Sequence, residues 1–193
     1  MAQRKTGLFF GSFNPVHVGH MILANFMATY TDMDEVWLVV SPQNPFKERA
    51  SLARDHDRLH LVELAIGDTP NLKASNVEFG MPKPSYTIDT LAVLRDKYPE
   101  REFCLIMGSD NLGSLGKWKN ADIILRDYDI HVYIRPGHGA GELGSHPRVT
   151  LHEAPLMHLS ATYVRKAVRE GKSIRYLVPE AVAREIEVTG LYR

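Results

Sequence analysis

The stretch FGSFNPVHVGH, residues 10–20, contains the side chains most able to do chemistry, His17 and His20. It follows the apolar run 8–10 and precedes a segment with helical character, so we expect a turn from a strand into a helix. The free N–H groups and the positive end of such a helix can face a bound anion. Histidines three positions apart on one helical face can donate hydrogen bonds to the same anionic group. The pattern favours phosphate as the ligand.

Three other interpretations of these histidines compete with phosphate binding. A zinc site needs a third and a fourth ligand, but the turn contains no cysteine, no carboxylate and no H-E-x-x-H pattern. A serine hydrolase would carry a G-x-S-x-G elbow, which the sequence lacks. Two histidines in purely structural hydrogen bonds also fit this stretch when it is considered alone.

A second candidate anion site lies near the end of the sequence, in LSATYVRKAV, residues 159–168. Ser160 is a good N-cap residue, and Thr162 and Arg165 lie three apart on one face of the helix that would follow. Hydroxyls, free N–H groups and a guanidinium would then converge on one anion. An ordinary capped amphipathic helix explains the same residues, but two such sites in one α/β chain favour a polyphosphate ligand.

The elements that must position these residues alternate along the chain. Runs rich in β-forming residues stand at 6–10, 35–40, 72–77, 102–107, 129–134 and 150–153. Between them, Leu59, Val62 and Ile66 recur at helical spacing, and the segment 87–98 carries a second apolar stripe. This order predicts βαβ units around a parallel sheet, in a single domain over residues 1–193. Helices from about residue 160 onward close the chain.

Length, charge and cysteine content exclude several classes of protein. The 193 residues carry 23 basic and 23 acidic side chains, so a zero net charge gives no support to a nucleic-acid or membrane-surface partner. The single cysteine, Cys104, lies in an apolar run and should be a buried thiol in a reducing compartment. No apolar stretch approaches the roughly 20 residues that cross a bilayer. We therefore expect a cytoplasmic protein.

A glycine-rich segment, residues 135–147, contains a G-x-G-x-x-G spacing at Gly139, Gly141 and Gly144. A dinucleotide-binding fingerprint of this kind needs a helix that opens at its last glycine. Here a serine, a histidine, a proline and another β-rich run follow instead. We therefore expect a surface loop.

Taken together, the motifs resemble the HxGH nucleotidyltransferases, through GSFNPVHVGH and LSATYVR. Further segments are similar to the nicotinate-mononucleotide adenylyltransferase family: PSYTIDTL at 84–91, LIMGSDNLGSLGKWKNADIIL at 105–125, RPG at 135–137 and YLVPEAVAREIEVTGLY at 176–192. The resemblance covers nearly the whole chain. It implies a Rossmann-like three-layer αβα nucleotidyltransferase fold with a mostly parallel central sheet, whose C-terminal helices complete the ATP site.

The reaction implied by the resemblance is adenylyl transfer from ATP to nicotinate mononucleotide, which yields nicotinate adenine dinucleotide and pyrophosphate in NAD biosynthesis. The attacking phosphate oxygen is already ionised, so no side chain must act as a general base. Catalysis then reduces to positioning and electrostatic stabilisation during an in-line displacement without a covalent enzyme intermediate. Mg²⁺ should travel with ATP, and we expect no metal site built from protein ligands.

The same resemblance assigns roles to residues. His17, His20, Lys47 and Arg165 form the catalytic set. The acceptor should contact Lys47, the Thr87 hydroxyl, the Trp118 ring and the backbone N–H near Lys119. The residues assigned to ATP are Gly11, Ser12, Phe13, His17, His20, Gly108, Asp110, Ser160, Thr162 and Arg165.

Two departures from the family pattern fall beside these residues. Asn14 stands where many members carry an aspartate, which removes a charge but keeps a side chain able to stabilise a turn. Phe46 replaces a histidine next to Lys47, so the lysine should supply the charge near the phosphates.

Alternative activities remain on the same scaffold. They are adenylyl transfer to nicotinamide mononucleotide or phosphopantetheine, cytidylyl transfer, and nucleotide binding by a non-catalytic regulator. A site with two hydrogen-bond donors for a ring substituent should prefer the carboxylate over the amide. The sequence does not define an oligomeric state.

Overall fold

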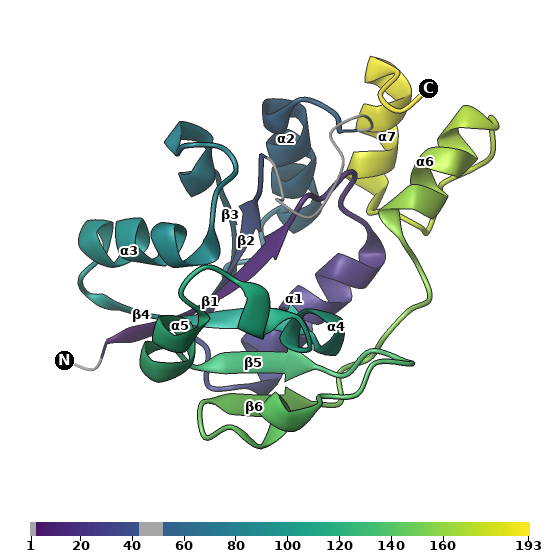
Figure 1. Ribbon diagram of the computed structural model, residues 1–193. Helices are drawn as coiled ribbons and strands as arrows, with labels where there is room; N and C mark the ends of the chain where they lie inside the picture. The colour runs from purple at the N-terminus through teal and green to yellow at the C-terminus, as the bar shows by residue number, and fades with distance from the viewer. Residues whose placement is uncertain (1–2, 43–51) are drawn as a thin grey trace.

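The computed structural model describes residues 3–42 and 52–193, and its centre is a six-stranded sheet (Figure 1). The strands lie in the order β3-β2-β1-β4-β5-β6, and every neighbouring pair is parallel. Their bounds are β1 (Arg4–Gly11), β2 (Glu35–Val40), β3 (Leu72–Ser75), β4 (Arg101–Gly108), β5 (Ile130–Tyr133) and β6 (Val149–His152). The predicted α/β fold with a parallel sheet is confirmed, and each strand begins and ends within two residues of its predicted limits.

Helices cover both faces of this sheet and give three layers. On one face pack α1 (Val18–Tyr30), α2 (Asp55–Ile66), α6 (Ala161–Arg169) and α7 (Glu180–Thr189). On the other pack α3 (Thr87–Lys97), α4 (Ser109–Leu112) and α5 (Ala121–Asp127). The described connections also contain the short 3₁₀ helices η2 (Val77–Gly80), η3 (Leu115–Lys117) and η4 (Glu142–Ser145).

The strand β2 shows why the sequence folds into layers. All six of its residues are buried, and alternate side chains enter opposite cores. Val36, Leu38 and Val40 join the core under α1 and α2, whereas Trp37 and Val39 join the core under α3. A strand buried on both faces reads as a continuous apolar run, and burial of each such side chain contributes about 1.5–3 kcal/mol. Cys104 is buried on β4 as expected, and burial raises the pKa of its thiol to about 12.

The strand order changes direction between β1 and β4. The chain runs outward from β1 through β2 to β3, then crosses to β4 and continues to β6 on the other side. In such sheets ligands bind beyond the carboxyl ends of the strands at this switch point. Because β1 and β4 are paired neighbours, the turn after β1, which carries His17, lies next to α4, which follows β4 and carries Asp110.

The glycine-rich segment after β5 forms no α-helix at Gly144, so the dinucleotide fingerprint is absent there. Gly144 belongs to η4, which begins after Gly141. The segment is largely exposed, as expected for a surface loop. It is nevertheless tied to the sheet, because the Ser109 hydroxyl donates to the backbone oxygen of His138 at 2.6 Å. Within the two described ranges, no helix has the length and apolarity needed to cross a membrane.

Candidate functional site

A cavity of about 1030 Å³ opens at the carboxyl ends of β1 and β4. Its lining brings together segments that are far apart in sequence: the turn after β1, the starts of α3 and α6, and the chain around η3. Most of the predicted site residues lie in this lining, namely Gly11, Ser12, Phe13, His17, His20, Thr87, Asp110, Trp118, Lys119, Ser160, Thr162 and Arg165. Gly108 lies outside it, and Lys47 falls outside the described residues.

The two histidines meet by stacking rather than by sharing one face of a helix. The helix α1 begins at Val18, so His17 is its N-cap residue, with φ at −140°. The ring of His20 stacks on that of His17 with centroids 3.7 Å apart, and His20 Nδ1 accepts a bond from the His17 backbone N–H at 3.2 Å. A Cβ atom at Gly19 would lie 3.1 Å from the His17 ring. The prediction that both histidines lie on one face of a helix is therefore wrong, because His17 precedes the helix. Both residues nevertheless line the cavity.

His17 is a neutral donor at neutral pH. The residue is 6% exposed, and burial lowers the pKa of its imidazole to about 4. Its Nδ1 atom has no hydrogen-bond partner within the described part of the chain. A buried polar atom without a partner costs free energy, and an anion in the cavity could provide the missing contact.

The turn between β1 and α1 is held in an unusual conformation. Phe13 has φ at 45°, a region that bulky residues rarely adopt and that costs about 1–3 kcal/mol. Its ring packs edge-on against Phe9 and His20, with centroids 5.9 and 5.1 Å away. A Cβ at Gly11 would lie 2.7 Å from the Phe13 ring, so only glycine leaves room for it. Packing thus fixes the turn before any ligand arrives.

The start of α6 faces this turn. Ser160 is the N-cap of α6, as predicted, and its hydroxyl accepts from the Tyr163 backbone N–H at 3.2 Å. Arg165 donates to the backbone oxygen of Asn14 at 2.7 Å and to the Thr162 hydroxyl at 3.3 Å. The backbone N–H of Val18 also donates to the Leu177 oxygen at 3.0 Å. Both predicted anion sites therefore belong to one cavity.

Asp110 is held beside an arginine that sequence reasoning missed. Its carboxylate pairs with Arg135 at 2.9 Å, and its Oδ1 atom is buried without a described partner. A Cβ at Gly108 would lie 2.4 Å from that Oδ1 atom and 2.8 Å from Arg135 Cδ. Gly108 therefore makes room for this pair, and its direct contact with ATP stays a prediction. The RPG motif was the signal for Arg135.

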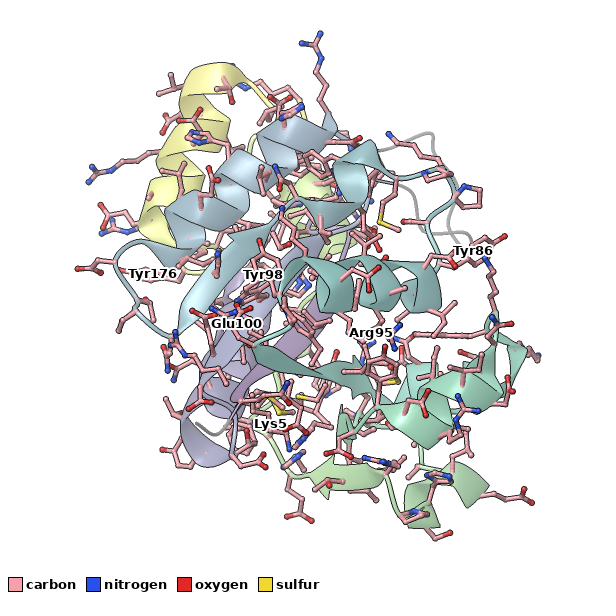
Figure 2. The ribbon with its side chains drawn as sticks, turned by 90° about the vertical axis from the view of Figure 1, so that its left-hand side faces the viewer. Lys5, Tyr86, Arg95, Tyr98, Glu100 and Tyr176 are labelled. Carbon is pink, nitrogen blue, oxygen red and sulfur yellow. The ribbon has the colours of Figure 1, made fainter. Side chains whose placement is uncertain are left out.

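On the acceptor side, Thr87 opens α3 and Trp118 follows η3. Trp118 is half-buried against the core under α3. The side chain of Lys119 pairs with both oxygens of Asp89, at 2.9 and 2.7 Å, and lies over the ring of Tyr86. Figure 2 shows Tyr86 at the start of α3, at the opposite end of that helix from Tyr98. The side chain of Lys119 thus joins the chain after η3 to α3, and the contact of its backbone N–H with the acceptor stays a prediction.

Two buried charged residues beside the cavity had no recognisable sequence signal. Glu78 is 2% exposed and accepts from the hydroxyls of Ser85 and Thr90, both at 2.8 Å. It lines the cavity and orders the chain that leads to Thr87. Arg58 on α2 is fully buried and binds backbone oxygens next to the turn after β1. From the sequence alone, Arg58 occupies a helical position at which an arginine is usually exposed to solvent.

Comparison with known proteins agrees with this geometry. The cytidylyltransferase-like family model matches residues 8–167. Proteins of Cytophaga hutchinsonii and Christiangramia forsetii, both named "Probable nicotinate-nucleotide adenylyltransferase", are 54% and 47% identical to this chain. The alignments cover 92% and 98% of this chain and 93% and 99% of those proteins.

Solved structures show the same fold. A Plasmodium falciparum nicotinic acid mononucleotide adenylyltransferase complexed with NaAD matches with a TM-score of 0.81 at 19% identity, over 98% of this chain and 97% of that one. The same enzyme complexed with APC matches with a TM-score of 0.80. The chain thus belongs to the nicotinate-nucleotide adenylyltransferase family of cytidylyltransferase-like nucleotidyltransferases.

Proposed function

We propose that this protein transfers the adenylyl group of ATP to nicotinate mononucleotide and releases pyrophosphate and nicotinate adenine dinucleotide, a step in NAD biosynthesis. The observation that carries the proposal is a single cavity whose lining includes the starts of α1 and α6, where the sequence predicts anion binding, and the aromatic side chain of Trp118. Such a cavity can hold a triphosphate and a ring-bearing acceptor at the same time. Relatives at 46–54% identity carry the name of this activity.

The phosphates of ATP would lie between the turn after β1 and the start of α6. His17 and His20 would hold the α-phosphate and the charge that develops on the bridging oxygen. Ser160, Thr162 and Arg165 would hold the β- and γ-phosphates, because a guanidinium and helix N–H groups favour anions. The bond between Arg165 and Asn14 supports this division, since it fixes the two groups of donors relative to each other.

The remaining contacts to ATP follow from the same arrangement. Gly11, Ser12 and Phe13 would offer the backbone of the turn to the phosphates. Asp110 would bind the ribose or shape its pocket, and Arg135 and Gly108 keep its carboxylate in place.

The acceptor would lie against Trp118, with its ring stacked on the indole. The Thr87 hydroxyl and the backbone N–H near Lys119 would receive its carboxylate. The network around Glu78 supports this arrangement, because it fixes the segment before Thr87. That Lys47 supplies a positive charge near the acceptor or ATP phosphates stays a prediction, because the residue lies outside the described part of the chain.

The chemistry needs no protein base, because the acceptor phosphate is already ionised at neutral pH. The protein would align the two substrates and stabilise charge on the leaving pyrophosphate during an in-line displacement. Pre-organised donors do this most effectively when they already point at the reacting group. The packing of the turn at Phe13 and the hydrogen bond that fixes the Arg165 guanidinium support such pre-organisation.

ATP-using nucleotidyltransferases generally require a divalent metal ion, and we propose Mg²⁺ bound to the ATP phosphates. The described residues include no group of three or more His, Cys, Asp or Glu side chains able to hold a metal. When bound, Mg²⁺ would neutralise charge on the triphosphate. We also propose that the chain acts as one domain in the cytoplasm, without a nucleic-acid or membrane partner.

The test is pyrophosphate release from Mg-ATP by the purified protein, with nicotinate mononucleotide, nicotinamide mononucleotide and phosphopantetheine as parallel acceptors. We expect release with the first acceptor at the highest kcat/KM. Preference for another acceptor would keep the phosphate site and discard the roles of Thr87 and Trp118. ATP binding without release would favour a regulator.

Stereochemistry tests the displacement itself. With an α-thiotriphosphate of known configuration, a single in-line displacement inverts the configuration at the α-phosphorus. Retention would indicate a covalent enzyme intermediate and would contradict the mechanism.

A further inference from the structure

The side chain of Arg58 is fully buried next to the turn after β1, yet it lies outside the lining of the cavity. Its guanidinium donates to the backbone oxygen of Ser12 and, at 2.9 Å, to that of Ser41. Its Nε atom donates to the backbone oxygen of Ala53 at 3.1 Å. One side chain therefore joins the turn after β1, the residue directly after β2 and the residues directly before α2.

The charge of Arg58 has a shared partner. Asp55 binds Arg58 at 2.8 Å and Lys83 at 2.9 Å, so one carboxylate stands between two cations. A buried ion pair is weak evidence for stability, because well-packed apolar side chains often do as well in its place. Stability alone therefore does not explain why this guanidinium is buried.

The bond to Ser12 sets the direction of the next peptide N–H. Because a trans peptide is planar, a Ser12 carbonyl that points to Arg58 makes the N–H of Phe13 point the opposite way. Phe13 itself has φ at 45°, a conformation that persists where its surroundings fix it. Aromatic packing holds the ring of Phe13, and Arg58 holds the peptide before it.

We propose that Arg58 is a positioning residue for adenylyl transfer, which holds the Ser12–Phe13 peptide with its N–H toward the nucleotide phosphates. The inference rests on the proposed function, because it concerns how the same site binds ATP. A flipped peptide would present a carbonyl oxygen to the phosphates and repel them. A misplacement of about 1 Å in such a site can cost about 10²-fold in rate.

The test compares Arg58→Lys with the matched control Arg54→Lys, an exposed residue one turn earlier in the chain. Arg58→Lys keeps the charge but loses the fork of donors. We expect kcat/KM for ATP to fall about 10- to 100-fold, with KM for the acceptor unchanged. The ³¹P resonance of the α-phosphate of bound ATP should also move, which a loss of stability alone would not cause. Arg54→Lys should match the wild type in every measurement.

A folded Arg58→Lys protein with wild-type kcat/KM and an unmoved ³¹P resonance would overturn the proposal. If that variant does not fold, Asp55→Asn removes the carboxylate partner and leaves the guanidinium. It should lower kcat/KM for ATP about 3- to 10-fold and move the same resonance, since an asparagine oxygen can still accept from the guanidinium and only the difference between a charged and a neutral hydrogen bond is lost. Wild-type values in that variant would overturn the proposal equally.

Failure of the proposed function is distinguishable from failure of this inference. If the wild type releases no pyrophosphate with any acceptor, the proposed function is wrong. In that case, the affinity of each variant for Mg-ATP, measured without an acceptor, tests the positioning role of Arg58. Weaker binding by Arg58→Lys than by Arg54→Lys supports the positioning role, and equal binding overturns it.

Discussion

Arg165 donates to the backbone oxygen of Asn14 at 2.7 Å, although 151 positions separate the two residues in the sequence. The bond joins α6 to the turn after β1. It places a guanidinium, a hydroxyl and two histidine rings around one cavity. This hydrogen bond therefore holds the two halves of the candidate site together.

Replacement of Arg165 with alanine should lower kcat about 10²- to 10³-fold, because it removes a pre-organised donor to the β- and γ-phosphates, which leave as pyrophosphate. It should also loosen the turn at Asn14. Steady-state kinetics with saturating acceptor would measure the loss. Arg169→Ala, at an exposed position on the same helix, should leave kcat unchanged. Equal activity in both variants would contradict the role of Arg165.

His20→Ala should reduce turnover by about 10²- to 10³-fold with the fold intact. The ring stacks on His17 and lines the cavity, so its loss removes a donor and releases its neighbour. Single-turnover rates and a circular dichroism melt would separate chemistry from folding. His60→Ala is the control, since that side chain is 52% exposed on α2. Near-normal turnover in a folded His20→Ala protein would exclude the assignment.

Thr87→Val should weaken discrimination between acid and amide acceptors. A hydrogen bond to a charged group contributes about 1.5–3 kcal/mol, so kcat/KM for nicotinate mononucleotide should fall roughly 10- to 100-fold. The value for nicotinamide mononucleotide should change much less. Thr29→Val, at an exposed position on α1, serves as the control. A parallel loss for both acceptors would place the hydroxyl outside the discriminating contact.

His131 should make the protein less stable in mild acid. It is buried at the far end of the sheet from the cavity, among Lys5, Asp32, Asp129 and His152. Burial lowers the pKa of its imidazole to about 4, below the usual value near 6.5. The unfolded chain therefore binds the proton first, so stability is complete above pH 6.5 and falls as the pH drops toward 4. The loss between pH 7.5 and pH 5 should be about 2 kcal/mol.

Urea unfolding at the two pH values would measure this loss in the wild type and in His131→Gln. The variant should show a smaller difference between the two pH values, whatever its absolute stability. His17 adds a loss of the same sign to both proteins. His158→Gln, at an exposed position, should retain the full wild-type difference. An equal difference in His131→Gln would contradict the assignment.

The sequence predicted the sheet well because period and burial agree at each strand. The runs around Leu38 and Leu105 are too apolar and too short for anything but buried strands between helices. The N-cap at Ser160 could also be predicted from the sequence, because a serine hydroxyl at a helix start accepts a hydrogen bond from a backbone N–H only a few residues away. The twelve predicted residues that line the cavity were identified from sequence motifs rather than from the periodicity of apolar residues.

What the sequence did not reveal depends on contacts between distant segments. Arg58 occupies an ordinary helical position, and only the approach of two strand ends buries it. Glu78 lies in a short 3₁₀ helix, whose partners come from the next helix. The histidine pair was placed on one helical face because the cap residue of α1 was taken as its first turn. Contacts between distant segments determine the position of each of these side chains, and the local sequence pattern does not encode such contacts.

The most direct test of the central claim is a competition in one reaction. The protein receives Mg-ATP with equal, limiting concentrations of nicotinate mononucleotide and nicotinamide mononucleotide, and chromatography measures the two dinucleotide products. Their initial ratio equals the ratio of the two kcat/KM values. The account predicts an excess of nicotinate adenine dinucleotide of about tenfold or more, the value of one hydrogen bond to a charged group. Equal products, an excess of the amide dinucleotide, or no product at all would contradict it.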